Sequence, residues 1–350
     1  MINSEQIYLL NNILKTNSPS GCEWQLVSLL KEYMVEYCLI ETDAIGNLYM
    51  WASQKKEGLT VMITAHADEV GFQVTDISKE GLVYFRSVAG ADQQTIPGSK
   101  IVVLAKKGEI RGVIGKKSPH AQESKEREKV LNNDEMWIDL GFESDEEAKS
   151  FLECGDYITF DATPQILSNR NRITSKALDN KLGVFILVEV IKQLRKKELP
   201  ISVVGVVTVQ EELGCRGSIT AANRIKPDIA FCIDVGIATD IPNMSSRKFG
   251  TFELGKGVGI VRNADNNDVL THILIDIAKK NKIPFQKSLG YRATGGTEAA
   301  YLQLAQNGAT VANISIPNRY MHSTVEICDL RDAESAIMLL VKTIKTLNNY

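Results

Sequence analysis

Four short apolar runs, rich in β-branched residues and separated by helical patterns, constrain the fold of this chain more than any other feature. The runs lie at residues 59–65, 201–209, 229–233 and 309–316. Helical patterns lie at residues 182–197, 268–281, 298–306 and 332–348. Apolar strands of this kind are typical of a parallel sheet buried on both faces, and their alternation with helices indicates the α/β class. We therefore expect a mainly parallel sheet covered by helices on both faces.

A helical pattern over residues 4–36 precedes the first run and breaks at Ser20-Gly21-Cys22-Glu23. Ser20 and Glu23 have the spacing of a capping box, in which two side chains bond to the free backbone N–H groups at a helix start. We expect a second helix to begin at this point.

The sequence pattern changes between residues 71 and 161, where glycines and charged residues separate several short runs typical of β-strands. Such spacing favours an all-β module, and the mixed-charge stretch 116–129 within it is expected to be a solvated loop. Residues 1–69 and 165–350 then form one discontinuous α/β domain, and residues 70–164 form an inserted β domain.

Composition excludes several classes of function. The net charge of −3 offers no basic stripe for nucleic acid and no attraction to an anionic membrane surface. No apolar run reaches the roughly 18 residues of a membrane span, and the first residues lack the pattern of a secretory signal. The six cysteines are scattered without a CxxC pair, so we expect reduced thiols and a cytoplasmic location.

Histidines and carboxylates follow the apolar runs at the points where the strands are expected to end. His66 and Asp68 follow the first run, Glu211-Glu212 the second, Asp234 the third and His322 the last, while Asp179 precedes the helix near Leu182. The carboxyl ends of strands in an open α/β sheet are where ligands bind. Taken singly, a histidine after a strand is more often a loop or capping residue than a ligand, and Asp179 alone is best explained as a helix cap. Two adjacent acids after a buried strand are harder to explain without cations or protons.

The set as a whole favours a metal site. Only four histidines exist, and two of them, His66 and His322, stand at strand exits beside acids. His120 and His272 are expected to lie in a loop and a helix without a role in the site. A mixed nitrogen and oxygen ligand set suits zinc, with cobalt or manganese as alternatives. Asp68, two residues after His66, is placed to accept the free N–H of that imidazole.

At this point the chain resembles the tetrahedral aminopeptidases, a group that includes glutamyl and deblocking aminopeptidases. The ordered series of motifs that carries the resemblance runs along nearly the whole chain: Ser20-Gly21-Cys22-Glu23, Asp43-Ala44-Ile45-Gly46-Asn47, Ala65-His66-Ala67-Asp68-Glu69-Val70-Gly71-Phe72, Pro97-Gly98, Ala177-Leu178-Asp179-Asn180-Lys181-Leu182-Gly183, Thr208-Val209-Gln210-Glu211-Glu212, Gly295-Gly296-Thr297-Glu298-Ala299 and Arg319-Tyr320-Met321-His322-Ser323.

The resemblance implies a metal-dependent aminopeptidase that removes the N-terminal residue of short peptides with two divalent metal ions per chain. It implies the following roles: Asp179 bridges the two metals, Glu212 and His322 bind one, His66 and Asp234 bind the other, Glu211 is the general base, and Asp68 orients His66. It also implies that the inserted domain is a β-barrel-like dimerisation domain, and that dimers assemble into a homododecamer.

Four positions depart from the family pattern without removing a ligand or the base. Glu298 stands where Asp is usual, Thr324 and Val258 where Pro is common, and Gly236 where Thr is common. Three other functions stay open from the sequence: a di-metal deacylase or dipeptidase of related fold, a glycoside hydrolase and a non-catalytic scaffold. A glycosidase needs two acids about 5–10 Å apart and no metal, whereas this chain supplies a mixed metal-ligand set.

Overall fold

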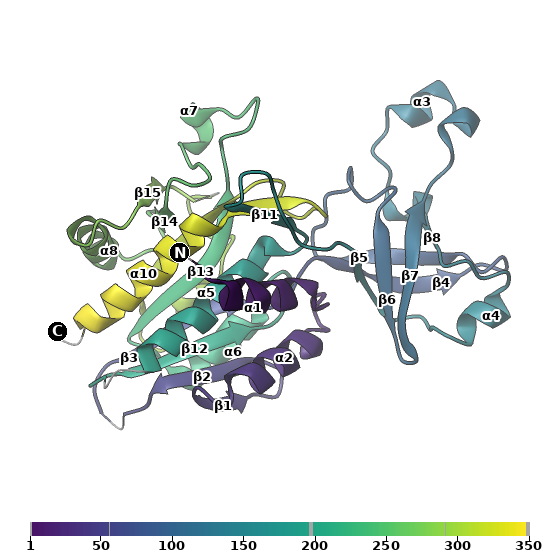
Figure 1. Cartoon of the computed structure of the whole chain (residues 1–350). Helices are drawn as coiled ribbons and strands as arrows, with labels where there is room; N and C mark the ends of the chain where they lie inside the picture. The colour runs from purple at the N-terminus through teal and green to yellow at the C-terminus, as the bar shows by residue number, and fades with distance from the viewer. Residues whose placement is uncertain (1, 56, 196–198, 291, 348–350) are drawn as a thin grey trace.

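The computed structural model describes residues 2–55, 57–195, 199–290 and 292–347, and these form two lobes that lie side by side (Figure 1). The larger lobe contains an eight-stranded sheet between helices, and the smaller lobe is a β barrel. Lys196, Lys197 and Asn348, which the sequence places in helices, lie outside the described residues. Within the described residues, no helix is long and apolar enough to cross a membrane.

The eight strands of the large sheet lie in this order: β1 (Leu39–Thr42), β2 (Leu48–Ser53), β12 (Ser202–Thr208), β3 (Thr60–His66), β13 (Ile229–Ile237), β16 (Thr310–Asn318), β14 (Val258–Val261) and β15 (Phe285–Ser288). The four central strands β12, β3, β13 and β16 are parallel and almost wholly buried. Antiparallel pairing occurs where β2 meets β1 and β12, and where β14 meets β16. The prediction of a mainly parallel central sheet is confirmed.

Helices cover both faces of this sheet, as the alternating pattern predicts. One face carries α1 (Ser4–Lys15), α2 (Trp24–Met34), α5 (Leu178–Arg195), α8 (Asp268–Lys280) and α10 (Leu330–Leu347). The other carries α6 (Arg216–Ile225) and α9 (Ala299–Leu302). Helix α5 packs on β3 and β13 and is itself covered by α1 and α10 (Figure 1). It is apolar almost all round because it has protein on every side.

The smaller lobe is a closed six-stranded barrel. Its strands, in order around the barrel, are β4 (Gly71–Ile77), β5 (Val83–Val88), β8 (Trp137–Asp139), β7 (Gly108–Gly115), β6 (Lys100–Ala105) and β9 (Tyr157–Phe160). Phe72 fills the barrel core and meets Phe85 and Phe160 edge to face, with ring centroids 5.1 and 5.4 Å apart. Closure leaves no free strand edge, so six short strands make a stable module.

Short elements complete the chain. They are the helices η1 (Pro119–Ala121), α3 (Ser124–Arg127), η2 (Asn133–Glu135), α4 (Asp145–Lys149) and α7 (Ser246–Phe249), and a small sheet of β10 (Gln165–Ile166), β11 (Arg172–Ser175) and β17 (Glu326–Asp329). The stretch 116–129 is largely exposed, as expected, but it contains η1 and α3 rather than a plain loop.

A buried ionic cluster lies where the two lobes join. Glu69 accepts hydrogen bonds from Lys181 at 2.9 Å and from Lys176 at 3.2 Å, and the three side chains are at most 3% exposed. Lys176 also donates to Asn17 in the larger lobe and to Thr159 in the barrel, at 2.8 and 3.0 Å. The cluster therefore connects the two lobes through a shared set of charges.

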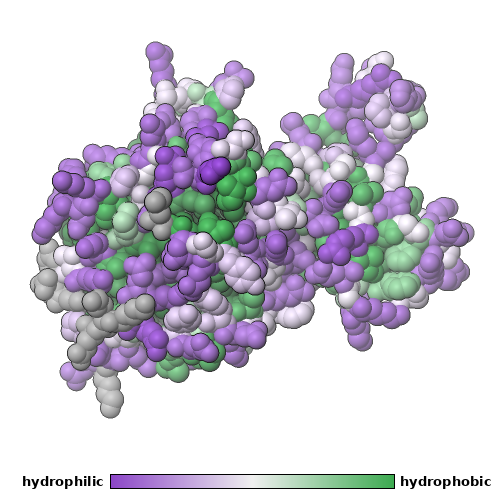
Figure 2. Space-filling view, in the orientation of Figure 1, coloured by the Kyte–Doolittle hydropathy of each residue, from purple (hydrophilic) through white to green (hydrophobic). Residues whose placement is uncertain are grey.

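The surface is mainly hydrophilic over both lobes, and hydrophobic residues also show on the barrel lobe (Figure 2). Among the barrel residues, the side chains of Val113, Val130 and Phe151 are 45, 50 and 44% exposed.

The structure differs from the sequence-based expectation at two further local points. The expected capping box is wrong: α2 has no side-chain cap, the Ser20 hydroxyl donates to Asp68, and Glu23 accepts from the backbone N–H of Gly21 and Gln210. The helix expected over residues 298–306 is only the short α9, which is followed by turns.

Candidate metal centre

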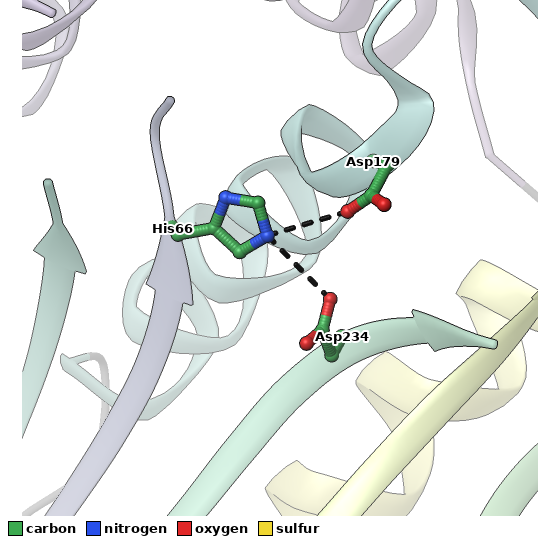
Figure 3. A group of neighbouring side chains, drawn as sticks. All are labelled: His66, Asp179 and Asp234. Atoms are coloured by element: carbon green, nitrogen blue, oxygen red, sulfur yellow. Dashed lines mark ion pairs between the residues drawn. The ribbon is translucent and has the colours of Figure 1, made fainter. Parts of the chain in front are cut away.

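The first group of candidate ligands lies at the carboxyl ends of the central strands (Figure 3). His66 is the last residue of β3, Asp234 lies within β13, and Asp179 lies at the start of α5. The His66 Nε2 atom is 3.3 Å from Asp179 Oδ1 and 3.6 Å from Asp234 Oδ1. The three side chains are buried and point toward one another, because β3 and β13 are parallel neighbours that end on the same side of the sheet.

A second group shares Asp179 with the first. His322 Nε2 is 3.3 Å from Asp179 Oδ2 and 3.1 Å from Glu212 Oε1. In each group, one ligand atom from every residue lies within 4.8 Å of the others. The two oxygens of Asp179 thus face different histidines, an arrangement that lets one carboxylate serve two cations.

Hydrogen bonds fix which nitrogen of each histidine faces the acids. His66 Nδ1 lies 3.1 Å from the backbone oxygen of Asp68, and His322 Nδ1 lies 2.6 Å from the backbone oxygen of Gly90. A carbonyl oxygen only accepts, so each Nδ1 carries the hydrogen and each Nε2 is left as the ligand atom. The sequence predicted that the Asp68 side chain would accept from His66. Its Oδ1 atom lies 3.4 Å from His66 Nδ1, and the backbone oxygen of Asp68 lies 3.1 Å from the same nitrogen.

The Asp68 carboxylate also anchors the segment after β12. Its Oδ1 accepts from the backbone N–H of Glu211 at 2.9 Å, and its Oδ2 accepts from that of Glu212 at 3.0 Å and from the Ser20 hydroxyl at 2.7 Å. Burial raises the pKa of Asp68, but the hydrogen bonds from His66 and these donors hold it below its ordinary value. The group is therefore a fixed negative charge beneath the site.

The electrostatics of the pocket favour cations. Burial, reinforced by the charge of Asp179, raises the pKa of Asp234 to about 6 and that of Glu212 above its ordinary value. Burial lowers the pKa of His66, but hydrogen bonds with Asp179 and Asp234 raise it well above its usual range overall. Crowded, buried carboxylates that face imidazole nitrogens match the mixed donor set of a divalent transition metal. The residues present fit two such ions.

Glu211 differs from its neighbour because it belongs to neither ligand group. Its side chain lines the same cavity, and burial together with the charges of Asp234 and Glu212 raises its pKa well above the usual range. The Cys215 thiol lies 3.2 Å from Glu211 Oε1 and donates to it. Glu211 therefore lies beside the ligand residues without belonging to either ligand group.

The site opens into a cavity of about 750 Å³. Its wall beyond the ligands contains several glycines and a few polar side chains: Gly214, Gly236, Gly290, Gly295, Gly296, Arg292, Thr297 and Asn313. The glycines leave room next to the ligands, and the volume suits a ligand of a few residues.

All seven residues that the sequence singled out lie within this site, and the two histidines that it set aside do not. His272 bonds within α8 and His120 lies in the exposed η1. Sequence reasoning missed Cys215 as a partner of Glu211, and it missed Glu326, which bonds to the backbone of both Asp179 and His322. A lone cysteine and an isolated acid carry no local signal of such contacts.

A family model and a characterised relative match most of the chain. The family model described as M42 glutamyl aminopeptidase matches residues 46–339. The lysyl aminopeptidase of Pyrococcus furiosus is 32% identical over 338 residues, which cover 95% of this chain and 94% of that protein.

Two solved structures share the fold along nearly the whole chain. The TET aminopeptidase of the marine sediment archaeon Thaumarchaeota archaeon SCGC AB-539-E09 superimposes with a TM-score of 0.92 at 34% identity, covering 98% of this chain and 96% of that one. The TET1 peptidase of Pyrococcus horikoshii, described as assembling into a tetrahedron or a large octahedral shell, gives 0.87 at 31% identity, covering 96% and 98%. Since the family model spans most of the chain and these relatives exceed 30% identity along nearly all of it, the chain belongs to the M42 family and is a metal-dependent aminopeptidase.

Proposed function

We propose that this chain binds two divalent ions, zinc by preference and cobalt or manganese as alternatives, and uses them to release the N-terminal residue of short peptides. The observation that supports this most directly is that the two oxygens of Asp179 face two separate ligand groups. His66 and Asp234 complete one site, and Glu212 and His322 complete the other. When bound, such a pair of ions supplies Lewis-acid activation of a water and of the scissile carbonyl.

Glu211 is the general base in this proposal. It takes the proton from the attacking water and passes it to the departing amine, which is the usual task of a carboxylate that lies beside a metal pair without binding it. Asp68 supports this role, because its carboxylate holds the backbone N–H groups of Glu211 and Glu212. The base and its neighbouring ligand are therefore positioned by one buried group.

The proposal extends to assembly and location. We assign residues 1–69 and 165–350 to the catalytic domain, and residues 70–164 to a barrel through which subunits form dimers, with a homododecamer as the final assembly. The exposed apolar side chains of Val113, Val130 and Phe151 and the shells described for the Pyrococcus horikoshii peptidase support this assignment. The six free cysteines are in keeping with a cytoplasmic location.

The reaction is tested by stripping the protein with a chelator and measuring hydrolysis of aminoacyl-anilides and short peptides before and after zinc, cobalt or manganese is restored. Release of N-terminal residues that returns only with metal supports the proposal. Two bound ions per chain without peptide cleavage would contradict it, and release of an acyl group from an N-acyl amino acid would identify a deacylase instead. Chelator-resistant cleavage of cellulose would identify a glycoside hydrolase.

Roles of single residues are tested by substitution. Glu211→Gln keeps the shape and the ligand groups but removes the base, so we expect full metal content and a fall in kcat of at least about 100-fold. Near-normal kcat in this variant would refute the assignment. Asp179→Ala and His322→Ala should bind less metal, and full stoichiometry in either would contradict the ligand set.

A further inference from the structure

Glu326 is a buried acidic side chain that does not line the cavity, yet it bonds to the two segments that carry Asp179 and His322. Its Oε2 accepts from the backbone N–H of Asp179 at 2.8 Å and from Asn318 Nδ2 at 3.1 Å. Its Oε1 accepts from the backbone N–H of His322 at 3.0 Å. One side chain on β17 thus connects the start of α5 with the loop after β16.

Both of these segments have irregular backbone, which gives the bonds to Glu326 particular weight. His322 has a φ of +64°, a left-handed conformation that disfavours residues with a side chain by about 1 kcal/mol or more. Asp179 has φ −78° and ψ 101°, so it departs from the helix that it begins. Backbone N–H groups in irregular, buried segments need a partner, and Glu326 supplies it for both residues.

The ligand atoms on these segments must lie close together for an ion to bind. His322 Nε2 and Asp179 Oδ2 are 3.3 Å apart, and neither residue is held in place by a regular ladder of a strand at its own position. Shifts of about 0.5 Å are enough to spoil a metal site, so the shared anchor controls the distance between the two ligands.

We propose that Glu326 is a positioning residue that couples Asp179 to His322 and thereby sets the affinity of the ion held by Asp179, Glu212 and His322. The inference rests on the ligand assignment of the proposed function. The hydrogen bonds of Glu326 to the ligand residues go to their backbone N–H groups. Substitution of Glu326 therefore removes no ligand side chain. The effect falls mainly on this ion, since two of its ligand residues, Asp179 and His322, bond to Glu326. The other ion shares only Asp179 with that anchor and keeps His66 and Asp234.

The test uses the full chain, stripped with a chelator and titrated with zinc or cobalt in a calorimeter. Glu326→Gln and Glu326→Ala should each weaken one of the two binding events by about 10- to 100-fold, the range for loss of a group that supports a metal ligand. The glutamine keeps the size of the side chain but has one acceptor oxygen, so it cannot serve both N–H groups. The visible spectrum of bound cobalt should change for the same ion.

Asp332→Asn is the matched control. Asp332 is also a buried carboxylate that accepts two backbone N–H bonds, from Gly255 and Gly257 at 2.7 Å each, but these residues carry no candidate ligand. This variant should lose stability to denaturant and keep both metal affinities within about threefold. If Glu326 had only a structural role, the Glu326 and Asp332 variants would change metal affinity in the same way.

Two outcomes overturn the inference: wild-type affinity for both ions in the Glu326 variants, or an equal loss of affinity in Asp332→Asn. His322→Ala separates this failure from failure of the proposed function. If His322→Ala loses an ion while the Glu326 variants keep both, only the positioning role is wrong. If His322→Ala also keeps both ions, the ligand assignment itself is wrong.

Discussion

The charge cluster at the junction of the lobes gives a stability prediction that can be worked from distances. Glu69 Oε1 lies 2.9 Å from Lys181 Nζ, and Glu69 Oε2 lies 3.1 Å from Lys176 Nζ. At an effective dielectric constant of about 20, each contact is worth roughly 5 kcal/mol of Coulomb attraction. The cost of burying three charges offsets most of that attraction, so the intact cluster adds little net stability.

Glu69→Gln removes the charge and leaves two buried lysine side chains without their carboxylate partner. Breaking a buried pair in this way costs about 3–5 kcal/mol, because the partner charge remains desolvated. We expect a loss in that range, measured as a lower midpoint of denaturant unfolding with chelator present throughout. The barrel side of the junction should loosen first, since Lys176 also bonds to Thr159 in β9.

Glu126→Gln is the control for this measurement. Glu126 pairs with Lys117 at 2.9 Å, a distance equal to the shorter buried pair, but the two side chains are 44 and 49% exposed. Solvent screens an exposed pair, which therefore contributes little to stability, so this variant should unfold close to wild type. The reasoning is refuted if Glu69→Gln loses less than about 1 kcal/mol or no more than the control does.

Two further substitutions probe groups near the site. Burial raises the pKa of Glu298 from 4.5 to about 7. Its contribution to the free energy of unfolding is therefore fully present below pH 4.5 and is lost as the pH rises through about 7. Chelator-treated wild type should therefore lose about 3 kcal/mol more than Glu298→Gln between pH 4.5 and 8 in urea titrations, and parallel curves would contradict this. Cys215→Ala removes the donor to Glu211 and should lower kcat roughly fivefold with KM and metal content unchanged, whereas Cys215→Ser should stay within about twofold. Equal kcat values for the two variants would show that the hydrogen bond has no role.

The sequence predicts the central sheet and the ligand set for the same physical reason. Parallel strands are apolar runs, and their carboxyl ends converge, so polar residues such as His66 and Glu212 after such runs must meet. Asp234 shows the limit of this rule, because β13 continues to Ile237 and the aspartate lies within the strand. Its side chain still faces the site, with its Oδ1 atom 3.6 Å from His66 Nε2.

Contacts between distant segments are what sequence patterns miss. Ser20 fits a local capping motif, but its hydroxyl bonds to Asp68, which is 48 residues away. Glu326 bonds to Asp179 across 147 residues, and no local pattern marks it. The inserted β module is visible from its short strands, but its closure into a barrel depends on pairing between β4 and β9, at its two ends.

The hydrogen bond between Gly90 and His322 joins the barrel and the ion sites in one thermodynamic cycle. Gly90 belongs to the loop between β5 and β6, and its backbone oxygen orients an imidazole of the larger lobe. A restraint that holds this loop in the position the imidazole needs must strengthen ion binding, and ion binding must favour that position by an equal free energy. A contact that another protein surface makes with the barrel is therefore read out as ion affinity, and withdrawal of the ion weakens that contact in return.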